Sequence, residues 1–195
     1  PESLNAVEIN RIMKRIYRTW DEGCFYELLD KFSISRSKII KEYSRGTKMK
    51  LSIAAALSHD PELLILDEAT SGLDPIVREE ILDIFMEFIQ DESHSVFISS
   101  HIISDLEKVC DYITFIHKGK IIFSEAKDGL LDNYGILKCS EDEFKNIDPE
   151  IVKGMRKNKF GTEALILKNK IRGDYVVDKA DIEDIMVFYI KERIQ

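Results

Sequence analysis

Two adjacent carboxylates that follow an apolar run are the residues best suited to chemistry. Leu63-Leu64-Ile65-Leu66 lies between Pro61 and the pair Asp67-Glu68. A short continuous apolar run of this kind predicts a strand buried on both faces. Ligands of α/β sheets gather at the carboxyl ends of strands, where one acid can hold magnesium and the other can orient or deprotonate an attacking water. The simpler alternative is that the pair only ends a strand and solvates a loop.

Three further polar segments accompany the acid pair. Ser71-Gly72-Leu73-Asp74-Pro75 follows it, and Ser99-Ser100-His101 ends the next predicted buried strand, Ser95–Ile98. Tyr43-Ser44-Arg45-Gly46-Thr47 opens a helix-forming run upstream. Each has a simpler interpretation when taken alone: Ser44 as a helix N-cap contributing ~1 kcal/mol, His101 as an ordinary histidine at a helix start, and Gly72 with Asp74 as a turn.

In this order and spacing the four segments resemble the signature, Walker B, D-loop and H-loop motifs of the ABC ATPase family. The resemblance implies that Asp67 reaches magnesium, that Glu68 is the general base for ATP hydrolysis, and that His101 is the switch histidine that contacts the γ-phosphate. It also implies that Asp74 is the D-loop aspartate, which communicates between the two halves of an ATPase dimer.

Ser44 and Gly46 match the serine and the second glycine of the family signature. The resemblance implies that they grip ATP bound to the opposite subunit, and the start of a helix offers free N–H groups and a favourable dipole to phosphate. Arg45 replaces the first glycine of the signature and Thr47 replaces its glutamine. We therefore expect the closure on ATP to be weaker or differently tuned.

The chain contains no GxxxxGK[ST] phosphate loop, and it also lacks the aromatic adenine contact and the Q-loop. We infer from the resemblance that it begins after the Q-loop, as an excised or truncated piece, and we expect negligible ATP turnover by this chain alone. In the family, the strand that leads into the phosphate loop lies between those corresponding to Ser95–Ile98 and Tyr112–Ile116. Its removal exposes backbone and apolar side chains, so we expect the isolated chain to aggregate or to form oligomers.

The apolar periodicity predicts a series of helices and a hairpin. An amphipathic helix is expected over Asn5–Trp20, with Asn5 and Glu8 as its capping box, and its apolar stripe is expected to pack in the core rather than to dock a partner. Lys118-Gly119 is expected to turn a hairpin. Further helices are expected at Phe25–Phe32, Thr47–Leu57, Pro75–Ile89 and Ile102–Cys110, and the hairpin strands at Tyr112–Ile116 and Lys120–Phe123.

The predicted fold class is α/β, with a P-loop NTPase-like ABC ATPase domain over residues 1–134. Within it, residues 1–43 are expected to form the helical subdomain and residues 44–134 the part of the core that carries the motifs. Residues 135–195 are expected to form a small α+β accessory module. Its predicted elements are strands at Ile136–Cys139 and Ala164–Lys168 and a closing helix at Asp181–Glu192.

Composition narrows the possible partners. The formal net charge of -8 argues against non-specific binding to nucleic acid. The three cysteines are widely spaced and without a CxxC pair, which indicates neither a disulfide framework nor a zinc site and fits a reducing cytosol. No apolar run approaches the roughly 20 residues that cross a bilayer.

The resemblance implies the ATP-binding and hydrolysing subunit of a transporter, using ATP and Mg²⁺, paired with a second ATPase subunit and with transmembrane permease subunits. Such a subunit is cytoplasmic and peripheral at the inner face of the membrane. Weak similarity of the ending Asp181–Met186 to exporter subunits favours export. The alternatives are a soluble ABC-type ATPase that serves DNA repair or translation, and a non-catalytic interaction or regulatory domain that kept the fold and lost the nucleotide site.

Overall fold

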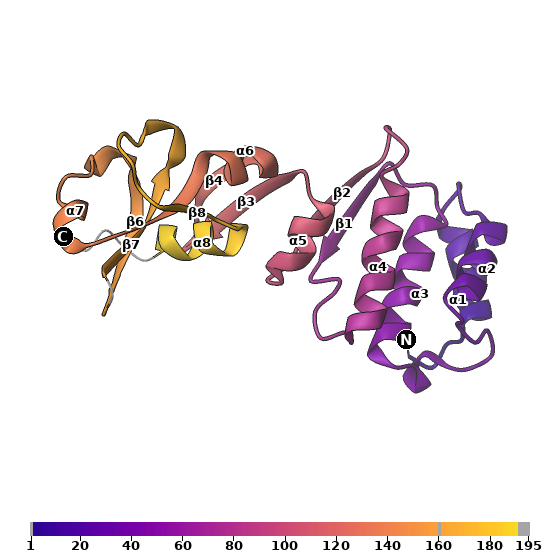
Figure 1. Ribbon diagram of the computed structural model, residues 1–195. Coiled ribbons are helices and arrows are strands. Elements are labelled where there is room, and N and C mark those ends of the chain that lie inside the picture. The colour runs from indigo at the N-terminus through magenta and orange to yellow at the C-terminus, as the bar shows by residue number, and fades with distance from the viewer. Residues whose placement is uncertain (1, 160, 191–195) are drawn as a thin grey trace. The chain divides into compact units, whose positions relative to one another are not determined.

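The chain is an α/β protein, as predicted, and the computed structural model describes residues 2–159 and 161–190. It divides into two compact units, Pro1–Asp105 and Leu106–Gln195. The predicted boundary between residues 134 and 135 stays a prediction. The helices and strands, labelled in Figure 1, are α1 (Ala6–Ile16), α2 (Glu22–Lys31), η1 (Ile40–Glu42), α3 (Arg45–Leu57), β1 (Leu63–Asp67), α4 (Pro75–Phe88), β2 (Ser95–Ser99), α5 (Ile103–Val109), β3 (Tyr112–His117), β4 (Lys120–Ala126), α6 (Lys127–Asn133), β5 (Tyr134–Cys139), α7 (Glu141–Phe144), η2 (Pro149–Ile151), β6 (Val152–Asn158), β7 (Gly161–Leu167), η3 (Lys168–Lys170), β8 (Val177–Lys179) and α8 (Ile182–Ile190).

Helix α1 begins with the predicted capping box. The Glu8 amide donates to the Asn5 side chain at 3.0 Å, and the Asn5 amide donates to the Glu8 carboxylate at 2.9 Å. The helix ends at Ile16, earlier than predicted. The prediction that its apolar stripe packs in the core is wrong for three residues. Ile12, Ile16 and Tyr17 are 40%, 63% and 40% exposed. The buried positions of α1 are Ala6 and Asn10 instead, so the packed face is rotated away from the apolar stripe.

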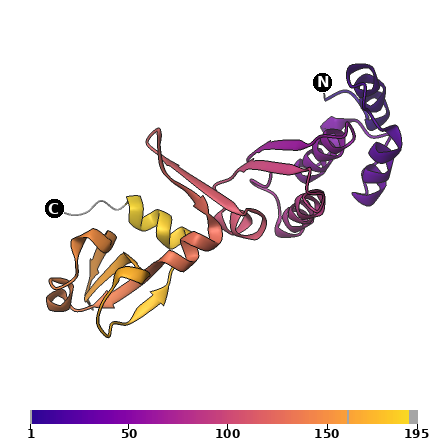
Figure 2. The ribbon, with the colours of Figure 1, turned by 90° about the horizontal axis from the view of Figure 1, so that it is seen from above.

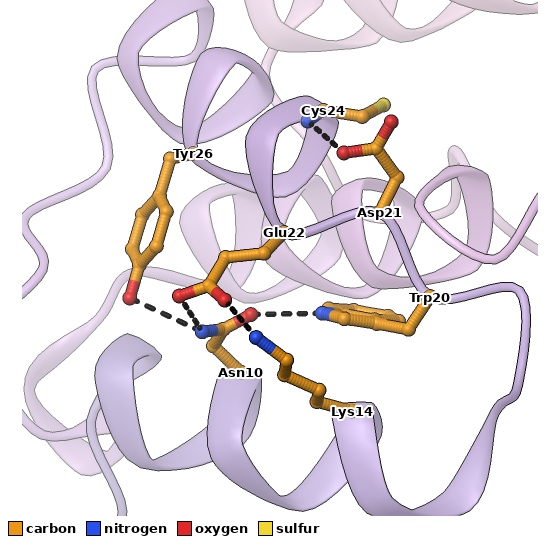
Figure 3. A network of polar contacts seen from close by, with 7 residues as sticks. All are labelled: Asn10, Lys14, Trp20, Asp21, Glu22, Cys24 and Tyr26. Atoms are coloured by element: carbon orange, nitrogen blue, oxygen red, sulfur yellow. Dashed lines mark hydrogen bonds and ion pairs between the residues drawn. The ribbon is translucent and has the colours of Figure 1, made fainter.

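A polar network joins α1 to α2 (Figure 3). Asn10 is buried and accepts a hydrogen bond from the Trp20 indole N–H at 2.8 Å. Its amide nitrogen donates to Glu22 at 2.9 Å and to the Tyr26 hydroxyl at 3.3 Å. Lys14 pairs with the other oxygen of Glu22 at 2.6 Å. Hydrogen bonds from Lys14 and from Asn10 hold the pKa of the Glu22 carboxyl below its ordinary value.

Strands β1 and β2 form a parallel two-stranded sheet in which Leu63 pairs with Ser95 and Asp67 with Ser99. Helices α3 and α4 lie between this sheet and the α1–α2 pair (Figure 1). The expectation that both strands are buried on two faces is wrong, because Ile65 and Phe97 are 72% and 68% exposed whereas Leu64 is buried. Alternate side chains point to opposite faces of a sheet, and the two helices cover one face only.

In the second unit, β3 and β4 form the predicted antiparallel hairpin. Its turn residues Lys118 and Gly119 have φ angles of 49° and 73°. Positive φ at both central residues is what a tight turn between right-twisted strands requires. Tyr112, Ile116 and Ile121 on this hairpin are exposed.

A four-stranded antiparallel sheet in the order β6-β7-β5-β8 completes the second unit (Figure 2). The predicted strands at Ile136–Cys139 and Ala164–Lys168 are confirmed as β5 and β7, whereas β6 and β8 were not predicted. The predicted closing helix is α8, and the end of its predicted range, residues 191–192, lies outside the described residues. Helix α8 lies so close to β6 that a side chain at Gly154 would come within 2.0 Å of the Phe188 carbonyl oxygen.

Within the described part of the chain, every helix is too short or too polar to span a bilayer.

Candidate functional site

The candidate site begins where β1 ends. Asp67 is the last residue of β1, and Glu68 turns the chain with a φ of 51°. The Glu68 amide donates to the Ser99 carbonyl at 3.0 Å and approaches the Ser99 hydroxyl at 3.2 Å. The ends of the two parallel strands are thereby tied together at the residue that carries the second carboxylate. A left-handed φ is uncommon for glutamate, so these bonds hold the turn in a conformation that the residue alone disfavours.

Two short side-chain contacts link the strand ends. The Ser99 hydroxyl donates to Asp67 Oδ1 at 2.5 Å. His101 Nδ1 lies 2.6 Å from Glu68 Oε2. Because an ionised carboxylate only accepts hydrogen bonds, the proton of this contact is on Nδ1, and Nε2 is the ring nitrogen left for a further partner.

The site is open to solvent. The side chains of His101 and Glu68 are 68% and 41% exposed. Exposed ion pairs contribute little to folding stability because water screens them. The contact between His101 and Glu68 therefore sets the orientation of two reactive groups more than it stabilises the fold.

The segment after the acid pair forms a turn and then starts α4. Gly72 has a φ of 67°, in the region that favours glycine. Asp74 is the N-cap of α4, where its carboxylate accepts from the Val77 amide at 3.1 Å, and Pro75 occupies the first turn. Gly72 and Asp74 thus lie in a turn that leads into α4, and a role for Asp74 between two subunits stays a prediction.

Ser44 is confirmed as the N-cap of α3. Its hydroxyl accepts from the Thr47 amide at 3.1 Å and lies 2.8 Å from the Thr47 hydroxyl. Gly46 is buried, and a β-carbon there would come within 3.0 Å of Val77 Cγ1. The start of α3 therefore packs directly against the start of α4.

Arg45, at the start of α3, lies against the turn that leads into α4. A β-carbon on Gly72 would come within 2.4 Å of Arg45 Nη1 and 2.8 Å of Arg45 Cζ, so the guanidinium lies against the glycine of the turn. The replacement of the first signature glycine by arginine thus fills the space beside Gly72.

The predicted site residues fall into two groups. Asp67, Glu68 and His101 are held together with Ser99, which sequence reasoning missed as a partner of Asp67. Its signal was its place at the end of the neighbouring strand, since Asp67 and Ser99 are in register. Ser44 and Gly46 belong to the junction of α3 and α4, and among the described residues no hydrogen bond joins Ser44 to the first group.

The donor set fits magnesium only in part. Within residues 2–159 and 161–190 no three histidine, cysteine or carboxylate side chains gather closely enough to hold a metal ion by themselves. Asp67 and Ser99 offer oxygen atoms at one point. Mg²⁺ in proteins takes one or two carboxylates and completes its shell with water and substrate phosphates. The residues present therefore fit an ion shared with a bound phosphate group.

Part of this chain matches a known protein family and several curated proteins. A family model described as "ABC transporter" matches residues 4–71. The lantibiotic transport ATP-binding protein SrtF of Streptococcus pyogenes is 42% identical over 110 residues, covering 55% of this chain and 48% of the relative. The bacitracin transport ATP-binding protein BcrA of Bacillus licheniformis is 45% identical over 85 residues, covering 44% of this chain and 28% of the relative.

Two solved structures have a fold similar to that of this chain. The structure described as an ATP binding subunit of an ABC transporter superposes with a TM-score of 0.58 at 26% identity, covering 67% of this chain and 56% of that chain. A putative metal-chelate type ABC transporter in an inward-facing conformation shares the fold, with a TM-score of 0.57 at 14% identity over 87% of this chain and 68% of that chain. The chain spans about half or less of the length of the curated relatives that it matches.

Proposed function

Because the chain belongs to the ABC transporter ATP-binding proteins, we propose that it carries the hydrolytic acids, the switch histidine and the signature helix of a transporter ATPase subunit. The observation that carries the proposal is the 2.6 Å contact between His101 Nδ1 and Glu68 Oε2, beside the Ser99 bond to Asp67. These contacts group Asp67, Glu68 and His101 at the ends of two parallel strands, where α/β proteins bind ligands, and this supports their assignment as metal-binding acid, base and orienting imidazole.

Each side chain has a distinct task in this proposal. Asp67 holds Mg²⁺, with Ser99 fixing the rotamer of the carboxylate. When bound, the ion supplies positive charge that neutralises the β- and γ-phosphates of ATP. Glu68 accepts a proton from the attacking water. His101 keeps Glu68 in place through Nδ1 and offers Nε2 to the γ-phosphate.

The second group of residues serves a second nucleotide. Ser44 and Gly46 stand at the start of a helix of 13 residues, whose free N–H groups favour an anion. No hydrogen bond among the described residues joins Ser44 to the acid pair, and the family resemblance gives Ser44 and Gly46 a role toward ATP bound by another subunit, with Asp74 and Gly72 alongside at the same junction. The proposed partners are therefore a second ATPase subunit and transmembrane permease subunits, with the site on the cytoplasmic side of the membrane and export as the direction.

The test is a glutamate-to-glutamine exchange in the complete subunit assembled with its permease. Glu68→Gln keeps the size and polarity of the side chain and removes the base. We expect turnover to fall by about 100-fold or more, the range of lost general-base catalysis, while ATP binding is retained. Radiolabelled ATP binding and phosphate release measure the two quantities separately.

Glu87→Gln is the matched control, because Glu87 on α4 is 67% exposed and pairs with Lys31 at the surface. It should leave turnover unchanged. Retained turnover in Glu68→Gln would reject the proposed base. For the present chain, which has no phosphate loop, we expect negligible turnover in the same assay, and magnesium-dependent hydrolysis that is sensitive to Glu68→Gln would contradict this expectation.

A further inference from the structure

Asp105 in the first turn of α5 is a buried carboxylate that is incompletely paired. It is 2% exposed, and its Oδ2 atom has no hydrogen-bond partner. Its Oδ1 atom lies 3.6 Å from Arg78 Nε, which is an ion pair but is longer than an N–H···O hydrogen bond. Burying a charge is costly unless it is paired and hydrogen-bonded, so this carboxylate requires the guanidinium beside it.

Each partner stands four residues after a predicted site residue, in the first turn of a helix. Arg78 stands four residues after Asp74, and its amide donates to the Asp74 carbonyl at 3.0 Å. Asp105 stands four residues after His101, and its amide donates to the Ile102 carbonyl at 3.1 Å. The ion pair therefore ties the first turn of α4, which the Asp74 segment leads into, to the first turn of α5, which His101 leads into.

We propose that Arg78 and Asp105 are a positioning pair that fixes the Asp74 segment and His101 relative to each other, and that closes into a two-bond contact during hydrolysis. The proposal rests on the proposed function and extends it to residues outside the acid pair. A guanidinium presents parallel N–H groups that fit both oxygens of a carboxylate, and Oδ2 of Asp105 is the acceptor still open. Neither residue touches the reacting atoms; each acts through the helix start before it.

Three variants of the complete subunit separate positioning from simple packing. Arg78→Lys keeps the positive charge and loses the two-bond geometry. Asp105→Asn keeps the size of the side chain and removes the charge. Arg78→Lys combined with Asp105→Asn carries both changes, so its effect can be compared directly with those of the two single variants. Glu87→Gln is again the control, because Glu87 lies on the same helix and its ion pair with Lys31 is exposed on both sides.

We expect kcat for ATP hydrolysis to fall by about 10- to 100-fold in Arg78→Lys and in Asp105→Asn, the cost of misplacing a catalytic group by about 1 Å. The KM for ATP should stay within about two-fold, because the contact acts in the hydrolysing state. The double variant should be no slower than the slower single variant, since both changes break one interaction. Glu87→Gln should match the unmodified subunit.

A kcat within about two-fold of the unmodified value for Arg78→Lys would overturn the proposal, as would single effects that multiply in the double variant. If Asp105→Asn fails to fold, Arg78→Lys still decides the question because it leaves a cation beside the buried carboxylate. Glu68→Gln is run in the same assay. If that variant is inactive while Arg78→Lys is fully active, the positioning pair is wrong and the proposed function stands; if Glu68→Gln is active, the proposed function itself fails.

Discussion

The β1–β2 sheet of the first unit and the four-stranded sheet of the second unit are buried to very different extents. In Pro1–Asp105, helices cover one face of β1 and β2, and the other face leaves Ile65 and Phe97 mostly exposed. In Leu106–Gln195, the central strands β5 and β7 hold Leu137, Leu165 and Ile166 with no exposed surface. The sheet that carries the acid pair is thus incompletely covered, whereas the four-stranded sheet of the second unit has a closed core.

The two units also differ in how exposed their polar side-chain contacts are. In the first unit, Glu68 and His101 are open to water and oriented toward each other. In the second, the Tyr134 and Tyr189 hydroxyls bond to each other at 2.7 Å, and burial together with this bond raises the pKa of the Tyr189 phenol. The polar contact at the strand ends of the first unit is thus exposed, whereas the tyrosine pair of the second unit lies in a more buried region.

The largest effect is expected from Phe188→Ala in the closed core. Phe188 is fully buried on α8, and truncating a buried phenylalanine costs about 3–5 kcal/mol. The single tryptophan, Trp20, lies in the first unit, so its fluorescence follows that unit alone. We expect urea unfolding by circular dichroism to show an early transition in the variant, while the fluorescence transition stays in place.

Val176→Ala is the matched control, because Val176 is 68% exposed in the same unit. It should change stability by less than about 0.5 kcal/mol. If Phe188→Ala instead moves the fluorescence and dichroism transitions together, the two units unfold as one and the contrast between them does not extend to stability.

A smaller loss is expected from Asn10→Ala in the first unit. The change leaves the buried Trp20 indole N–H without its acceptor, and an unsatisfied buried polar group costs about 1–3 kcal/mol. Trp20 fluorescence should report the earlier unfolding directly. Gln90→Ala, at an exposed glutamine of the same unit that bonds to the Met86 carbonyl, should leave that transition unchanged. Equal stability of the two variants would mean that the α1–α2 network does not hold this unit together.

Local signals in the sequence predicted much of the fold and the grouping of the site. The Asn5 and Glu8 box starts α1, and Lys118-Gly119 turns the hairpin, because these conformations depend on a few neighbouring residues. The meeting of Glu68 with His101 follows from two parallel strands that end at one edge. Both rules use spacing along the chain and need no knowledge of distant packing.

The remainder depends on contacts that spacing does not reveal. Strand β6 is rich in basic residues and contains Gly154, and β8 has three residues, so neither has a pattern that indicates a strand. An apolar run shows that side chains can be buried but not that another element covers them, which is why the exposure of Ile65 and Phe97 was missed. The Arg78 and Asp105 pair likewise joins helices that are separate in sequence.

Low pH should weaken the α1–α2 network of the first unit, because protonation of Glu22 removes the charge of its carboxylate. Because its folded pKa is lowered by Lys14 and Asn10, the ionised carboxylate contributes stability above its ordinary pKa, and this contribution is lost as the pH falls through the lowered value. Thermal unfolding followed by Trp20 fluorescence should therefore show the chain more stable than Glu22→Gln at neutral pH, with the difference vanishing in acid. A difference independent of pH would show that the charge of Glu22 is not what stabilises the network.

The smallest change in stability, with a clear change in association, is expected from Ile65→Thr combined with Phe97→Thr. Both side chains lie on the bare face of the β1–β2 sheet, the face that no helix covers. Threonine is chosen because it retains a preference for strands. Exposed apolar surface of this kind favours association, so the unmodified chain should sediment as concentration-dependent oligomers and the double variant as a smaller species. Ile16→Thr removes an equally exposed side chain from α1 and leaves the sheet untouched, which makes it the control. Were Ile16→Thr to disperse the oligomers as well as the sheet variant does, association would arise from general surface apolarity and the bare sheet face would have no special part in it.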